Sequence, residues 1–192
     1  MKKIALLGGT FDPIHKAHIE IAKKAVSALG LDKVIFVVAG QPPHKTGDYR
    51  IDAFHRYNMV KIAIVEEKCF EVSDYEIKKR GKSYSYLTAA HFKNKYPDSK
   101  IYFIIGDEAF REMSSWRHPE KLSELVKFAV FTRDGGTVSG KCEKIEIEPI
   151  NISSTQIREM LAEGKDAGEL LPDGVMEYIR KNNLYGVKGD NF

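Results

Sequence analysis

Residues 6–18 read LLGGTFDPIHKAH, and this stretch decides the fold of the chain. An apolar run stops at Gly8 and Gly9, and two histidines, His15 and His18, follow three residues apart. A buried strand that gives way to glycines and then to a helix is the start of a βαβ unit. Glycines let a phosphate approach the backbone, and a helix start supplies free amides and a positive dipole. The stretch therefore predicts an α/β protein with an anion-binding loop after its first strand.

The rest of the chain alternates between strand-like and helical segments. Strands are expected at 4–7, 33–39, 100–106, 128–132 and 144–150, with a strand or short hairpin arm at 69–77. Helices are expected at 19–29, 53–65, 85–96, 120–126, 154–162 and 173–182. Strands separated by such helices form mostly parallel sheets with right-handed crossovers. We predict one doubly wound α/β domain at residues 1–186, with helices on both faces of its sheet, and a loose tail at 187–192. A turn is expected at Asp134-Gly135-Gly136.

Local signals predict how the helices begin and which way they face. Asp12 is expected to cap a helix with Pro13 at its first position. Ser83 is expected to cap the helix at 85–96. The residues of helix 53–65 expected to face inward are Phe54, Tyr57, Met59, Ile62 and Ala63. Loops at the carboxyl ends of parallel strands hold the ligands of such folds, so the loops after Leu7, Ala39, Gly106 and Thr132 should converge.

Composition narrows the class of protein. The 192 residues are 43% hydrophobic and 30% charged, as in soluble globular proteins. A net charge of +3, from 30 basic and 27 acidic residues, argues against nucleic-acid binding. No apolar run approaches the ~18 residues of a membrane span or the apolar core of a signal peptide, so a cytoplasmic location is expected. Cys69 and Cys142 show no C-x-x-C spacing, which disfavours a disulfide framework and a thiolate metal site.

Several phosphate or metal motifs begin with similar residues. A dinucleotide-binding G-x-G-x-x-G is absent, because the next glycine after Gly9 is Gly30. For zinc, His15 and His18 lack a third ligand and the H-E-x-x-H pattern. Either histidine could be an ordinary surface residue. Two histidines beside two glycines and a helix start nevertheless favour anion binding.

GGTFDPIHKAH (8–18) resembles the G-G-T-F-D-P-x-H-x-G-H signature of the nucleotidylyltransferases, with Ala17 in place of the last glycine. Further segments, in order, are similar to bacterial nicotinate-nucleotide adenylyltransferases: PPHK (42–45), RYNMVKIAI (56–64), SYS (83–85), FIIGDE (103–108), Trp116, ISSTQIR (152–158) and YIRKNNLY (178–185). The resemblance implies a Rossmann-like fold. It also implies attack by the phosphate of nicotinate mononucleotide on the α-phosphorus of ATP, with Mg²⁺ bound through the ATP phosphates. Two alternatives stay open: another phosphate substrate, such as nicotinamide mononucleotide or phosphopantetheine, and a non-catalytic nucleotide-binding module.

The resemblance also implies two groups of site residues. The ATP half would comprise Gly8, Gly9, Thr10, Phe11, His15, His18, Gly106, Arg133, Ile152, Ser153, Ser154, Thr155 and Arg158. The mononucleotide half would comprise His44, Lys45, Ser83, Tyr84, Ser85, Glu108 and Trp116. The residues expected to act on the reacting phosphates are His18, His15, Arg158 and Lys45, with the largest role at His18.

Four of these positions either allow a second interpretation or lie where the chain departs from the family. Ser153 with Gln156 forms a capping box, which is compatible with phosphate binding by the residues after it. Trp116 is either packing or a stacking platform for the pyridine ring. The family usually has Gly-x-Asp where this chain has Gly106, Asp107 and Glu108, so either carboxylate could bind the ribose. Arg133 matches the family, but Asp134 replaces the proline after it.

Overall fold

The computed structural model describes residues 1–40, 51–79, 81–133, 138–148 and 150–188. Three predicted features lie outside this part of the chain: the loop with His44 and Lys45, the turn at Asp134, and the last four residues of the predicted tail. The side chain of Arg133 also lies outside it.

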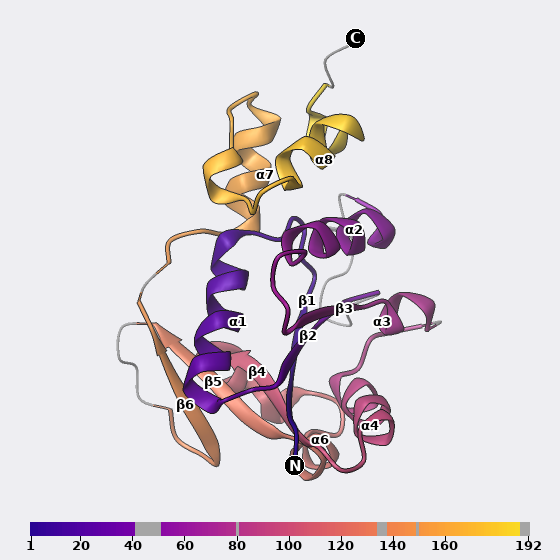
Figure 1. Ribbon diagram of the computed structural model, residues 1–192, viewed down its shortest axis with the longest axis vertical. Coiled ribbons are helices and arrows are strands. Elements are labelled where there is room, and N and C mark those ends of the chain that lie inside the picture. Colours follow the sequence, from indigo (N-terminus) through magenta and orange to yellow (C-terminus); the bar gives the residue numbers. More distant parts are fainter. Residues whose placement is uncertain (41–50, 80, 134–137, 149, 189–192) are drawn as a thin grey trace.

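A six-stranded sheet organises the described residues (Figure 1). Its strands are β1 (Lys3–Gly9), β2 (Lys33–Val38), β3 (Phe70–Ser73), β4 (Lys100–Gly106), β5 (Lys127–Arg133) and β6 (Cys142–Ile147). Their spatial order is β3-β2-β1-β4-β5-β6, and every neighbouring pair is parallel. Strands β2 and β3 therefore extend the sheet on one side of β1, and β4, β5 and β6 extend it on the other side. The predicted doubly wound α/β fold is confirmed.

Helices cover both faces of this sheet. They are α1 (Lys16–Leu29), α2 (Ala53–Ala63), α3 (Tyr75–Lys78), α4 (Ser85–Lys95), α5 (Asp107–Arg111), α6 (Pro119–Leu125), α7 (Ser154–Ala162) and α8 (Val175–Lys181). The described residues also contain the short 3₁₀ turns η1 (Glu112–Ser115) and η2 (Gly168–Leu170), which connect helices, and η3 (Leu184–Gly186), which follows α8. Figure 1 shows α7 and α8 at the end of the molecule where α1 begins, opposite the N-terminus. None of the described helices has the length and hydrophobicity needed to cross a membrane.

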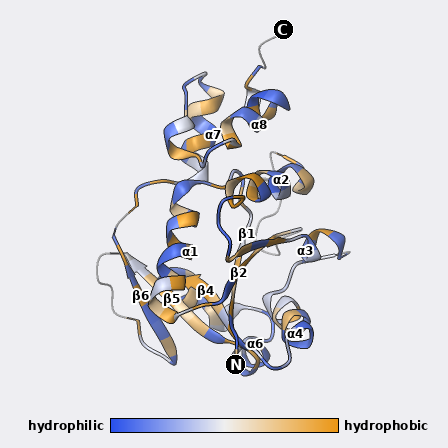
Figure 2. Cartoon of the chain, viewed as in Figure 1, coloured by the Kyte–Doolittle hydropathy of each residue, from blue (hydrophilic) through white to orange (hydrophobic). Residues whose placement is uncertain are grey.

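Alternating side chains divide the core into two clusters. Ala5 and Leu7 of β1 point into the cluster that also holds residues of α1, α2, α7 and α8. Ile4 and Leu6 point into the opposite cluster, with residues of α4 and α6. Successive strand residues face opposite sides of a sheet, so a central strand covered on both faces is apolar throughout. Figure 2 shows this as hydrophobic colouring along the central strands.

Several predicted boundaries and orientations are wrong. Of the two alternatives for 69–77, the strand is confirmed at Phe70–Ser73, which pairs parallel with β2, and the hairpin arm is wrong, since Tyr75–Lys78 is helical. Phe54 does not face inward, since it is 62% exposed at the start of α2. The last strand spans Cys142–Ile147 rather than 144–150. Helix α1 begins at Lys16, before the predicted start.

The helix starts correct two capping predictions and confirm a third. The residue that precedes α1 is His15, not Asp12, and Pro13 lies outside the helix. Helix α4 begins at Ser85 after Tyr84, and Ser83 does not cap it. Ser153 does cap α7, because its hydroxyl accepts the N–H of Gln156 at 3.1 Å. The two wrong predictions place a cap too early, by three residues at Asp12 and by one residue at Ser83.

Candidate nucleotide-binding site

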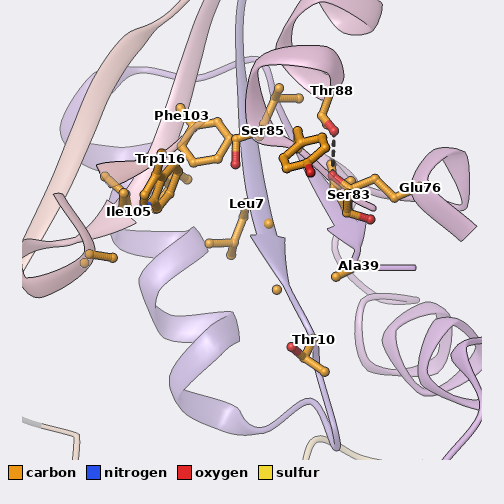
Figure 3. Close-up of a pocket in the computed structure, with 18 of the residues that line it drawn as sticks. Leu7, Thr10, Ala39, Glu76, Ser83, Ser85, Thr88, Phe103, Ile105 and Trp116 are labelled. Carbon is orange, nitrogen blue, oxygen red and sulfur yellow. Dashed lines mark hydrogen bonds between the residues drawn. The ribbon is translucent and has the colours of Figure 1, made fainter. Parts of the chain in front are cut away.

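A cavity of about 370 Å³ opens at the carboxyl ends of β1, β2, β4 and β5. The backbone around it comes from the loop after β1, from Ala39 after β2 and from Gly106 after β4. Figure 3 shows Trp116 and Phe103 on one side of it, Glu76 on the other, and Leu7 between them. Three of the four loops expected to converge therefore do so. The loop after Thr132 is only partly within the described residues.

The glycine loop brings its backbone close to aromatic side chains. A Cβ added at Gly9 would lie 2.7 Å from the ring of Phe11, which excludes any larger residue while that ring stays in place. Phe11 has a left-handed backbone, with φ 53°, and its side chain is 2% exposed. Its ring meets the ring of His18 edge-on, with centroids 5.0 Å apart. Phe11 thus supports the loop from within the core, while Gly8, Gly9 and Thr10 line the cavity.

The two histidines stack on each other, but only His18 is among the residues that line the cavity. His18 lines the cavity, whereas His15 is buried and is not among the lining residues. Their rings stack, with centroids 3.7 Å apart. The backbone N–H of His15 donates to Nδ1 of His18 at 3.2 Å. An imidazole whose Nδ1 accepts a hydrogen bond carries its proton on Nε2 when neutral. His18 therefore has one N–H to offer a ligand, through Nε2.

The environment of His18 keeps it neutral. Burial, together with the nearby His15, lowers the pKa of His18 well below its ordinary value of 6.5. The unfolded chain therefore takes up a proton at His18 on mild acidification, while the folded chain does not. Stability attributable to this residue is present above the unfolded pKa and is lost as the pH falls below it.

This asymmetry predicts a pH effect on stability. Between about pH 7.5 and about pH 5.5, the wild type should lose roughly 1 kcal/mol more unfolding free energy than His18→Gln. Urea denaturation of both proteins at the two pH values measures the difference, and the comparison cancels titrating groups that do not interact with His18. Equal pH dependence in the two proteins would show that His18 protonates as easily in the folded state.

The segment Ile152–Arg158 lies against the turn that follows the glycine loop. The hydroxyl of Ser154 donates to the carbonyl of Pro13 at 2.9 Å, and Nη1 of Arg158 donates to the carbonyl of Asp12 at 2.8 Å. Nη2 of Arg158 donates to Oγ1 of Thr155 at 3.2 Å. The side chain of Ile152 packs against the core. The motif is thus brought beside the glycine loop, outside the set of residues that line the cavity.

Ser83, Tyr84, Ser85 and Trp116 also line the cavity. Trp116 meets Phe103 edge-on, with ring centroids 6.4 Å apart, so it packs on the core and also faces the cavity. Two aromatic side chains on one wall suit a planar ring as ligand.

The structure adds polar residues that sequence reasoning missed. Glu76 lies at the cavity wall and accepts a hydrogen bond from Thr88 Oγ1 at 2.5 Å. Burial raises the pKa of Glu76, while hydrogen bonding to Thr88 and Ser83 lowers it. Arg56, which is 1% exposed, donates to the carbonyl of Thr10 at 2.6 Å and to that of Ala39 at 2.9 Å. Arg56 lies within the RYNMVKIAI segment. Its position in the helix does not predict that its side chain is buried or that it donates hydrogen bonds to two separate loops.

Sequence comparison identifies relatives over nearly the whole chain. Residues 6–160 match the cytidylyltransferase-like family. A probable nicotinate-nucleotide adenylyltransferase of Clostridium tetani is 42% identical, over 96% of this chain and 100% of the relative. A protein with the same description from Clostridium acetobutylicum is 41% identical, with the same coverage.

Solved structures show the same fold. The nicotinic acid mononucleotide adenylyltransferase of Plasmodium falciparum, complexed with NaAD, superposes with a TM-score of 0.77 at 22% identity, over 98% of this chain and 99% of that one. The same enzyme complexed with APC gives a TM-score of 0.76. Full-length identity above 40% to such relatives, together with the family match over residues 6–160, settles the classification. The chain belongs to the cytidylyltransferase-like family and, within it, to the nicotinate-nucleotide adenylyltransferases.

Proposed function

We propose that this protein transfers the adenylyl group of ATP to nicotinate mononucleotide, giving nicotinate adenine dinucleotide and pyrophosphate, a step of NAD biosynthesis. The observation that carries the proposal is a cavity whose lining includes the glycine loop and His18 as well as Tyr84 and Trp116. Such a cavity lets two nucleotides meet end to end. The Plasmodium falciparum enzyme of the same fold was solved with NaAD and with APC, which supports a site of this kind.

The proposed reaction needs no covalent intermediate between the protein and a substrate. An oxygen of the mononucleotide phosphate forms a bond to the α-phosphorus of ATP, the bond from that phosphorus to the bridging oxygen breaks, and pyrophosphate leaves. The nucleophile is already an anion, so catalysis depends on alignment and on stabilising charge at the reacting phosphorus. The Nε2–H of His18 is the donor for that charge. Gly8, Gly9 and Thr10 contribute the backbone along the phosphates.

Other cations complete the proposed ATP site. We assign Arg158 to the pyrophosphate end and Lys45 to the mononucleotide phosphate, with His44 beside it. Mg²⁺ would enter with ATP, held by the phosphates and by water, and would offset their charge. The described residues contain no group of three His, Cys, Asp or Glu side chains that could hold a metal ion. We expect the enzyme to work in the cytoplasm, on ATP and the mononucleotide alone.

The start of α4 supports nicotinate rather than nicotinamide as substrate. Helix α4 begins at Ser85, and its preceding residue, Tyr84, makes no side-chain cap. Free amides at a helix start and the helix dipole favour an anionic group such as the nicotinate carboxylate. The NH₂ of nicotinamide would face donors instead.

Pyrophosphate release tests substrate and reaction together. The protein is mixed with ATP, Mg²⁺ and, separately, nicotinate mononucleotide, nicotinamide mononucleotide or phosphopantetheine. Because a charge-assisted hydrogen bond contributes ~1.5–3 kcal/mol, kcat/KM should favour the nicotinate form at least ~10-fold over the amide. Equal use of both, or preference for the amide, would contradict the substrate assignment. No release with any of them would indicate a nucleotide-binding module.

The ribose contact can be assigned between two neighbouring carboxylates. Oδ2 of Asp107 already accepts from Arg111 at 2.9 Å, whereas Glu108 is exposed one residue further along α5. We therefore expect Glu108→Ala to raise the KM for the mononucleotide more than Asp107→Ala does. Steady-state kinetics on both variants decide the matter. The reverse ranking would place the ribose at Asp107.

A further inference from the structure

The turn η3, near the C-terminal end of the described residues, makes a contact that the proposed reaction has not used. The hydroxyl of Tyr185 in η3 donates to Oδ1 of Asp12 at 2.6 Å, across 173 positions of sequence. Asp12 is 4% exposed and belongs to the turn of residues 10–13, between the glycine loop and α1. The C-terminal segment thereby reaches the loop on which we place ATP.

The backbone at η3 adopts a left-handed conformation at two residues that are not glycine. Asn183 and Tyr185 have φ values of 50° and 56°, in the left-handed region that residues with a Cβ rarely adopt. Leu184 between them is buried in the core, and its carbonyl accepts the N–H of Val187 at 3.1 Å. Unfavourable backbone conformations persist where the surrounding contacts impose them. The buried leucine and the bond to Asp12 are two such contacts.

In the turn of residues 10–13, three backbone carbonyl groups accept hydrogen bonds from side chains. The donors are Arg56 Nη1 to Thr10 at 2.6 Å, Arg158 Nη1 to Asp12 at 2.8 Å, and Ser154 Oγ to Pro13 at 2.9 Å. In a trans peptide the next N–H points away from the carbonyl, so the N–H groups of Phe11 and Ile14 point away from these donors. The carboxylate of Asp12 is the one charged side chain of the turn.

Two guanidinium groups bind the backbone of this turn, because Arg158 donates to the carbonyl of Asp12 itself and Arg56 donates to that of Thr10. Burial and the negative charge of Asp12 raise the pKa of Tyr185, while the charges of Arg158 and Arg56 act in the opposite direction. Tyr185 therefore keeps its proton and acts as the donor. A carboxylate that turned toward Arg158 would compete with a phosphate for the same guanidinium, because both anions bind it in the same geometry.

We propose that Tyr185 is a positioning residue for ATP: it holds the Asp12 carboxylate toward the C-terminal turn and leaves Arg158 to meet the phosphates. This inference rests on the proposed ATP site. It adds that η3, far from the signature motif in sequence, determines how well that site accepts a triphosphate.

Tyr185→Phe tests the proposal, with Tyr178→Phe as the matched control. Tyr178 lies in α8, near Tyr185 in sequence. Its hydroxyl bonds with Asn58 and His55 of α2, each at 3.0 Å, and not with residues 10–13. ATP affinity by calorimetry and the KM for each substrate are measured on both variants and on the wild type. Tyr185→Phe should raise the Kd and KM for ATP about tenfold, the scale of one hydrogen bond to a charged group. The KM for nicotinate mononucleotide should change less than about twofold, and Tyr178→Phe should leave both KM values near the wild type.

A second pair of variants keeps the test informative if Tyr185→Phe folds poorly. Asp12→Asn removes the charge that Tyr185 restrains, so adding Tyr185→Phe to it should raise the KM for ATP by less than about twofold. The inference is overturned if Tyr185→Phe alters only the melting temperature, if it raises both KM values equally, or if the two variants act independently. A wild type that binds ATP but releases no pyrophosphate would contradict the proposed reaction instead, while the calorimetric comparison would still test the role of Tyr185.

Discussion

His18→Ala should lower kcat by about 10²-fold or more, the scale observed when a preorganised donor to transition-state charge is removed. The reason is local. The Nδ1 atom of His18 is engaged by the His15 backbone, so Nε2–H is the group left to serve the cavity, and its neutral state is maintained by burial. Alanine removes that donor, together with the Nδ1 atom that accepts the His15 N–H.

Turnover measured at saturating ATP and mononucleotide gives the effect. His91→Ala is a suitable control, since His91 stacks on Tyr75, outside the residues that line the cavity. Circular dichroism establishes that both variants are folded. Turnover close to that of the wild type in a folded His18→Ala protein would remove His18 from the catalytic residues.

Arg158→Ala should weaken the binding of ATP and pyrophosphate roughly 10- to 150-fold, as expected for a charge-assisted contact of ~1.5–3 kcal/mol. Mononucleotide affinity should change little. The structure gives a second reason for a large effect, because Arg158 also donates to the carbonyl of Asp12 and so supports the turn beside the glycine loop.

Calorimetric titration with ATP, pyrophosphate and the mononucleotide separates these ligands. Arg180→Ala removes an exposed guanidinium that pairs with Asp166, and it serves as the control for a general loss of positive charge. Unchanged ATP affinity in Arg158→Ala would mean that the ISSTQIR segment is a capped helix that supports the turn, without a phosphate contact of its own.

The fold was predictable because its strands carry strong local signals. The runs at 4–7, 33–39 and 100–106 are apolar throughout, as in strands covered on both faces, and the structure places them together at the centre of the sheet. The segment 69–77 was harder. It contains a four-residue strand and a four-residue helix, each too short to show its own periodicity.

Residue patterns alone predicted the site where residues close in sequence make it. The family resemblance added five further residues that line the cavity, which are Ser83, Tyr84, Ser85, Gly106 and Trp116. Gly8, Gly9, Thr10 and His18 share one stretch, and all four line the cavity. Capping signals misled at Asp12, because its carboxylate is engaged by Tyr185 instead of by a helix start. Arg56 and Glu76 act through contacts with distant loops and helices, and no local pattern specifies such partners.

The bond between Asp12 and Tyr185 also sets an order of events during synthesis. The glycine loop is made first, yet its partner is added 173 residues later. At about 5–20 residues per second on the ribosome, roughly ten to thirty seconds separate the two. A nascent chain can assemble β1 against β2 early in that interval, but it lacks the hydroxyl that restrains Asp12 until Tyr185 emerges. If Tyr185 positions Asp12 as we propose, full affinity for ATP arises only after η3 has been synthesised.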